Sequence, residues 1–307
     1  MTPIFTWVLA LLLNPPQEAE MSERLAPPGW QGNYWGPEAT KARHEGRMPA
    51  IVITPHMARW DGWGRRVLKD GDILFRRGDA RLAHGYFPIS KFLANASNSP
   101  FSHTGVVSVE EEGPVVYDTT RTGVARQPFC VWVLDNVGWI GVKRLRPEHR
   151  GSIPKVLAYI HKVFEEQVPF DYELEEDDRK LYCVEMTEKA YRAAGFKLSE
   201  PIRLGDMERA PEYPFCMFGL RIASIYSLQQ PLTFDSRVFF PGNDRHGIWS
   251  AKQLMTVIPP TFAPGYPDMS VSVKTVGSPP GIAVPSPKKV SAPRRPNDAT
   301  KPTREGT

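Results

Sequence analysis

The chain has 307 residues, of which 41 % are hydrophobic and 11 % aromatic, enough to bury one large core or two smaller ones. Its 38 Lys and Arg residues nearly balance 34 Asp and Glu residues, and much of the excess lies beyond residue 287. That distribution argues against a nucleic-acid-binding protein, whose positive charge gathers on one folded face. The three cysteines cannot all pair and show no zinc-binding spacing, so we expect neither a metal nor a cofactor.

The N-terminus, residues 1–20, contains an apolar run at residues 3–13 that only Thr6 interrupts. The run is shorter than the ~20 residues that span a bilayer, and it has the length of a signal-peptide core. However, no Lys or Arg precedes it and no small-residue cleavage site follows; a buried segment, or a start at Met21, is the alternative. The run favours a secreted, periplasmic or membrane-associated protein over a cytoplasmic one.

Residues 21–65 are rich in Trp, Gly and Pro without sustained periodicity, which predicts an irregular N-terminal extension. The alternation in DGDILFRRG then places Ile73 and Phe75 on one face of a strand. Apolar residues follow at roughly helical spacing over residues 80–95, and the turn-forming sequence NASNSP ends this segment. We expect the folded domain to begin at about residue 66, just before this strand.

A β-hairpin is the clearest element that follows. Residues 104–109 and 115–120 are rich in β-branched side chains and are separated by the turn sequence EEEGP. Three more elements are expected after it: a strand at 132–145, an amphipathic helix at 153–166, and a helix at 181–194 preceded by an acidic loop. These elements predict an α+β fold, with an antiparallel sheet packed against helices over residues 66–258. The Pro-rich remainder, residues 259–307, is expected to be disordered.

Cys183 is the first candidate for chemistry, because it lies early in the last predicted helix. A helix N-terminus lowers the pKa of a thiol and offers backbone N–H groups to an oxyanion. This benefit shrinks if the helix starts at Asp178. The alternative role is structural, since free cysteines are commonly buried as small hydrophobic residues. Glu185, two residues further on, is rotated away from the thiol and is expected to make a structural hydrogen bond.

His103 is the candidate partner, since an imidazole can take the proton of a nucleophilic thiol near neutral pH. Asp118, on the neighbouring strand of the hairpin, is the candidate that orients the imidazole. If Val109 faces Val115, however, Asp118 falls opposite Val106, three residues from His103. Contact between the two side chains then requires a bulge or a shifted register. Otherwise, Asp118 is a solvated strand residue and His103 a packed or solvated one.

Four segments in order and spacing, GDILFRRG, FSHTGVV, VVYDTTRTGV and DYELEEDDRKLYCVEM, resemble the circularly permuted NlpC-type papain-like hydrolases of the YiiX/YebB-like branch. The resemblance covers about residues 70–200 and implies a permuted papain-like fold. It implies Cys183 as nucleophile, His103 as general base and Asp118 as the third polar residue, where glutamate is the commoner occupant. It also implies that Asp72 fixes the turn before the first strand.

The resemblance implies a cysteine hydrolase that acts on cell-wall peptides or on other small amide or ester substrates. Two alternatives remain: a lipid acyltransferase similar to the lecithin–retinol enzymes, in which a second histidine would stand where Asp118 stands, and a non-catalytic binding module. We expect no nucleic-acid partner, and membrane association would run through the N-terminus; the oligomeric state stays open. Substrate specificity is expected to depend on residues 20–65, 80–100 and 205–250, which we predict to form the walls of a substrate-binding groove.

Overall fold

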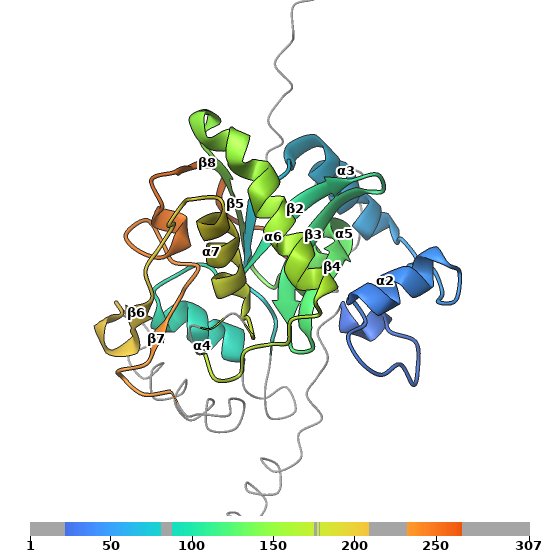
Figure 1. Cartoon of the computed structure of the whole chain (residues 1–307), viewed down its shortest axis with the longest axis horizontal. Helices are drawn as coiled ribbons and strands as arrows, with labels where there is room; N and C mark the ends of the chain where they lie inside the picture. Colours follow the sequence, from blue (N-terminus) through green and yellow to red (C-terminus); the bar gives the residue numbers. More distant parts are fainter. Residues whose placement is uncertain (1–21, 81–87, 175–176, 178, 209–231, 266–307) are drawn as a thin grey trace, which may run out of the picture.

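The computed structural model describes residues 22–80, 88–174, 177, 179–208 and 232–265. Its centre is an antiparallel sheet with the strand order β4-β3-β2-β1-β5-β8, and β6 and β7 form a small sheet beside it (Figure 1). The strands are β1 (Ile73–Arg76), β2 (His103–Glu110), β3 (Gly113–Thr120), β4 (Gly123–Pro128), β5 (Trp139–Leu145), β6 (Ile202–Arg203), β7 (Arg237–Val238) and β8 (Leu254–Phe262). The helices are α2 (Pro37–His44), α3 (Pro55–Val67), α4 (Ile89–Ala96), α5 (Phe129–Trp132), α6 (Ile153–Glu165) and α7 (Cys183–Ala193). This mixture of helices and antiparallel sheet confirms the predicted α+β class.

Helices cover both faces of the large sheet. Each strand contributes to both cores, because its alternate side chains point to opposite faces. In β1, Ile73 and Phe75 pack in the core that α6 and α7 cover. Leu74, between them, points into a second core that α3 and α5 cover. The sheet is therefore the middle layer of three, and the order of its strands places β1 and β2 at its centre (Figure 1). No described helix is long and apolar enough to cross a membrane.

The N-terminal extension is not irregular as predicted, since it contains α2 and α3. Thr54 caps α3 by accepting a hydrogen bond from the backbone N–H of Met57 at 3.2 Å, and Pro55 occupies the first turn. Met57, Trp60 and Trp63 recur at helical spacing and are buried against the sheet. The abundance of Trp, Gly and Pro concealed this period.

One predicted boundary in the middle of the chain was also wrong, and one strand was missed. The strand expected at 132–145 begins only at Trp139, because α5 and a 3-10 turn (Val133–Asp135) precede it. Strand β4 was not predicted at all. Periodicity cannot separate a buried strand from a buried helix in a short apolar run such as FCVWVL, which explains the error. The correction matters, since it moves Trp132 from a strand onto a helix.

Strand β8 crosses the boundary predicted at residue 258, continues to Phe262 and pairs with Trp139 of β5. Pro259 and Pro260 fit because β8 is an edge strand and its register shifts at this point. Other predicted segments lie outside the described residues: all of 1–20, residues 81–87 and 209–231 of the expected groove walls, and 266–307 of the tail. Cys216 falls in one of these ranges.

Candidate active site

Cys183 is the first residue of α7, so the thiol stands at the N-terminus of the helix. Leu181 cannot join the helix because it is held extended: it forms a bridge with Phe170, and its N–H donates to the carbonyl of Pro169 at 3.0 Å. Tyr182, also extended, is the N-cap residue. The helix thus begins at Cys183 rather than at Asp178, so the thiol lies in its first turn. The positive end of the helix dipole favours the thiolate form of Cys183.

His103 begins β2, and the register of the hairpin brings Asp118 to it. Val109 faces Pro114 and Val106 faces Tyr117, one residue away from the expected pairing. The same register places Asp118 beside Gly105, on the same face of the sheet as His103 and diagonal to it. His103 Nε2 donates to Asp118 Oδ2 at 2.7 Å. The hairpin thus has the shifted register that a contact between His103 and Asp118 requires.

Gly105 makes room for this diagonal contact. A Cβ atom at this position would lie 2.5 Å from Val116 Cγ1 and 3.3 Å from the Cβ of Asp118. Any side chain at residue 105 would therefore force Val116 to shift and would crowd Asp118.

The Asp118 carboxylate is fully buried and receives several donors. Trp132 Nε1 donates to Oδ2 at 2.6 Å, and Gln127 Nε2 donates to Oδ1 at 3.5 Å. The ring of Trp132 also lies against that of His103, with centroids 6.0 Å apart and planes tilted by 35°. Trp132 therefore fixes the carboxylate and the imidazole together. Sequence reasoning missed it; the only signal was the need of a buried indole N–H for an acceptor.

Arg76 balances the negative charge behind the site. This arginine is 1 % exposed; its guanidinium lies 3.9 Å from Asp118, 3.3 Å from Asp135 and 4.2 Å from the centre of the Trp132 ring. Asp135 also accepts hydrogen bonds from Ser22, from the backbone N–H at 3.0 Å and the hydroxyl at 2.7 Å. A buried charge needs such partners, because desolvation is costly. The signal in the sequence was an arginine in an otherwise apolar central strand.

Cys183 and His103 stabilise each other's charged forms, and Nδ1 is the ring nitrogen that remains for the thiol because Nε2 is bonded to Asp118. Burial raises the pKa of Cys183, but the charge and hydrogen bond of His103 and the backbone N–H of Thr104 outweigh it, so this pKa is lowered. Burial lowers the pKa of His103, whereas the Cys183 thiolate and Asp118 raise it to about 10. Both shifts favour a thiolate–imidazolium pair at neutral pH.

The other candidates serve the framework. Asp72 is buried; Arg144 donates to both of its oxygens at 2.6 Å, and the backbone N–H of Lys69 donates to it at 2.9 Å, so Asp72 holds the turn before β1. Burial raises the pKa of Glu185 to about 7, and Lys189, at 3.0 Å, offsets part of this rise. Among the described residues no group of three His, Cys, Asp or Glu side chains could hold a metal ion.

A helix-borne cysteine that faces a strand-borne histidine oriented by a carboxylate defines the papain-like class of cysteine hydrolases. The histidine precedes the cysteine in this chain, so the order is permuted. Residues 67–254 match the family of permuted papain-like amidase enzymes described as YaeF/YiiX, C92. The chain belongs to this family and is an enzyme that hydrolyses amide bonds, which confirms the predicted resemblance.

Among solved structures, the crystal structure of metalloprotein yiiX from Escherichia coli O157:H7 is similar to this chain. The two are 23 % identical, with a TM-score of 0.49, and the alignment covers 62 % of this chain and 96 % of that chain. No curated protein matches the sequence.

Proposed function

We propose that the protein is a cysteine amidase in which Cys183 is the nucleophile, His103 the general acid and base, and Asp118 the residue that orients the imidazole. Family membership supports amide hydrolysis. The residue roles rest on one observation above all: His103 donates Nε2–H to Asp118 at 2.7 Å, and its charge lowers the pKa of Cys183, which lies at the start of α7. This geometry supports a preformed ion pair rather than a buried structural thiol.

In the proposed reaction, the Cys183 thiolate attacks the carbonyl carbon of the amide. The carbonyl oxygen becomes an oxyanion, and the first backbone N–H groups of α7 are placed to donate to it. As the intermediate collapses, the C–N bond breaks and the His103 imidazolium gives its proton to the leaving amine. An acyl-enzyme thioester remains. Neutral His103 then takes a proton from water, the hydroxide adds to the thioester, and the acid is released with the thiolate restored.

Asp118 keeps His103 productive throughout this cycle. The carboxylate accepts a hydrogen bond from Nε2–H, so in neutral His103 the basic nitrogen is Nδ1. Trp132 and Arg76 hold the carboxylate in place and balance its charge. We infer that the substrate is a small amide, with the stem or cross-link peptides of the cell wall as the first candidates. The family resemblance supports that class.

The decisive variant is Cys183→Ala, tested with the full chain against peptidoglycan fragments and simple peptide amides. We expect the variant to lose all turnover and keep its melting temperature, because the change removes only one atom. The matched control is Cys130→Ala: burial raises the pKa of this second thiol to about 11, so its loss should leave turnover unchanged.

Labelling provides a second readout. A peptide chloromethyl ketone should add once to Cys183, seen by intact mass, and His103→Ala should slow that addition. Turnover retained by Cys183→Ala would overturn the mechanism. Acyl transfer between lipids without amide hydrolysis would reassign the protein to the lipid acyltransferases of the same fold.

A further inference from the structure

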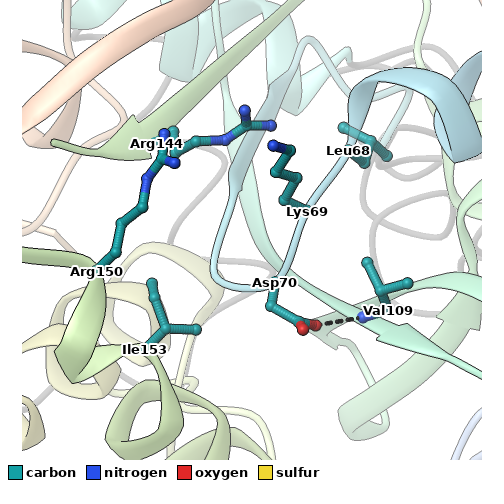
Figure 2. A pocket seen from close by; sticks show the side chains of 7 residues that line it. All are labelled: Leu68, Lys69, Asp70, Val109, Arg144, Arg150 and Ile153. Carbon is teal, nitrogen blue, oxygen red and sulfur yellow. Dashed lines mark hydrogen bonds between the residues drawn. The ribbon is translucent and has the colours of Figure 1, made fainter. Parts of the chain in front are cut away.

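A cavity of about 400 Å³ lies beside the turn that precedes β1 (Figure 2). Its lining residues are Leu68, Lys69, Asp70, Val109, Arg144, Arg150 and Ile153. His103 begins β2 and Val109 is near its end, so at ~3.3 Å per residue the cavity is roughly 20 Å from the imidazole. The cavity is thus separate from the proposed catalytic residues.

One wall of the cavity is cationic. Figure 2 shows the charged ends of Lys69, Arg144 and Arg150 on one side, and Asp70 with Val109 on the other. Asp72 and the carbonyl of Val67 fix the Arg144 guanidinium at 2.6–2.8 Å through Nε and Nη2. Within the described residues its Nη1 donates to no acceptor, which leaves a rigid donor available to a ligand.

The charged side chains around the cavity carry one more positive charge than negative charges. Asp72 neutralises Arg144, whereas Lys69 and Arg150 form no ion pair with any carboxylate in the part of the chain that the structure describes. Asp70 supplies one negative charge, but its carboxylate accepts the backbone N–H of Val109 at 2.6 Å on the other side of the cavity. A ligand with a single negative charge would therefore complete the balance.

The rest of the lining is apolar. Leu68, Val109 and Ile153 contribute, and Val109 is 46 % exposed. Ile153 lies on Gly71, which has φ +68°; a Cβ atom at Gly71 would be 2.3 Å from Ile153 Cδ1. Glycine therefore keeps the isoleucine in its place beside the cavity. Small-molecule pockets of ~300–1,000 Å³ typically combine such apolar walls with a few polar anchors.

We propose that this cavity binds a small organic monoanion in which the charged group adjoins a short branched apolar chain. The anion lies between Lys69, Arg150 and Nη1 of Arg144, and the apolar chain lies on Leu68, Val109 and Ile153. Two sources share this chemistry: the carboxylate of an apolar amino acid or peptide C-terminus, and the phosphodiester of a phospholipid. The proposal does not rest on the proposed amidase function.

The test is calorimetric titration of the full chain with N-acetyl-leucine and with dihexanoyl-phosphatidylglycerol below its micellar concentration. N-acetyl-leucine amide, which lacks the charge, is the control ligand. We expect saturable binding of one of the anions and at least tenfold weaker binding of the amide, since a charge-assisted hydrogen bond is roughly twice as strong as a neutral one. Tighter binding of N-acetyl-leucine identifies a carboxylate site, and tighter binding of the phospholipid identifies a headgroup site.

Variants locate the binding. Lys69→Ala combined with Arg150→Ala should weaken it at least tenfold, and Val109→Glu should abolish it by placing a negative charge in the apolar wall. Lys162→Ala is the matched control, because this exposed lysine lies on α6 away from the cavity. All substituted positions are at least partly exposed, and thermal melting checks that each variant folds. Absence of saturable binding by both anions, equal affinity for the neutral amide, or undiminished binding by the double variant overturns the proposal.

Discussion

Replacement of Asp118 by asparagine is the sharpest test of how the site is held. The substitution keeps the size of the side chain but removes its charge and converts one acceptor into a donor. Oδ2 accepts from His103 at 2.7 Å and Trp132 at 2.6 Å, and Oδ1 faces Gln127 at 3.5 Å. Gln127 can turn its amide so that its Oε1, which has no partner among the described residues, accepts from the new NH₂ group, and the remaining oxygen then faces His103 and Trp132 without a negative charge. The imidazolium of His103 therefore loses the negative charge of its hydrogen-bond acceptor and keeps only that of Cys183.

The expected size of the effect follows from that contact. A hydrogen bond to a charged group contributes about 1.5–3 kcal/mol, and one pKa unit corresponds to ~1.36 kcal/mol. The pKa of His103, which is about 10, should thus fall by about 1 to 2 units. The pKa of Cys183 should not rise, because the charge of Asp118 itself raises that pKa and is lost in the variant. In the variant, the thiolate–imidazolium pair should therefore break down at a lower alkaline pH, whereas the pH at which it forms should not rise.

An NMR titration of protein labelled with ¹³C at its histidines measures this directly, with the His103 signal assigned from its loss in His103→Asn. Asp72→Asn is the matched control, since it too removes a buried carboxylate bonded to an arginine, but far from the imidazole. The control should leave the titration of His103 unchanged. A His103 pKa in Asp118→Asn equal to that of the wild type would refute the role of the carboxylate.

Three further predictions follow from the site and its supports. The pH profile of kcat/KM should rise as Cys183 ionises, at a pKa below its ordinary value, and fall near pH 10 as His103 loses its proton; an alkaline limb near pH 7 would contradict the ion pair. Gly105→Ala places a Cβ atom 2.5 Å from Val116 Cγ1 and should lower the free energy of unfolding by about 1–3 kcal/mol in urea titrations, whereas an unchanged stability would refute the crowding argument. Glu185 has its pKa raised to about 7, so its contribution to stability is fully present below the unfolded pKa and declines as pH rises. Between pH 5 and pH 8 the free energy of unfolding of the wild type should therefore fall by about 2–3 kcal/mol more than that of Glu185→Gln. Parallel curves of unfolding free energy against pH for the two proteins would contradict the raised pKa of Glu185.

Local patterns predicted the elements whose periodicity was clean. Alternation in β1, the paired β-branched runs of the hairpin and the amphipathic spacing of α6 were all recognised from sequence. The same approach missed α3, where Trp60 and Trp63 mark a helical face inside an unusual composition. It also placed Trp132 on a strand, because a short apolar run has no period that separates strand from helix.

The candidate site shows the same division. Residue type and the order of the motifs made Cys183, His103 and Asp118 the candidates, because only a few side chains suit nucleophilic catalysis. The sequence could not settle whether the last two touch. A shift of one residue in the hairpin register decides that contact, and the register depends on turn geometry and on the packing of both faces.

By itself, then, the sequence determined the fold class, the permuted order of histidine and cysteine, and the residues able to form an ion pair. Tertiary structure decided the rest: the register that sets Asp118 beside Gly105, the start of α7 at Cys183, and the arrival of Trp132 and Arg76 behind the carboxylate. The physical reason is that hydrophobic period and side-chain chemistry are local properties. The pKa values of a buried pair depend instead on which distant donors and charges share its low-dielectric surroundings.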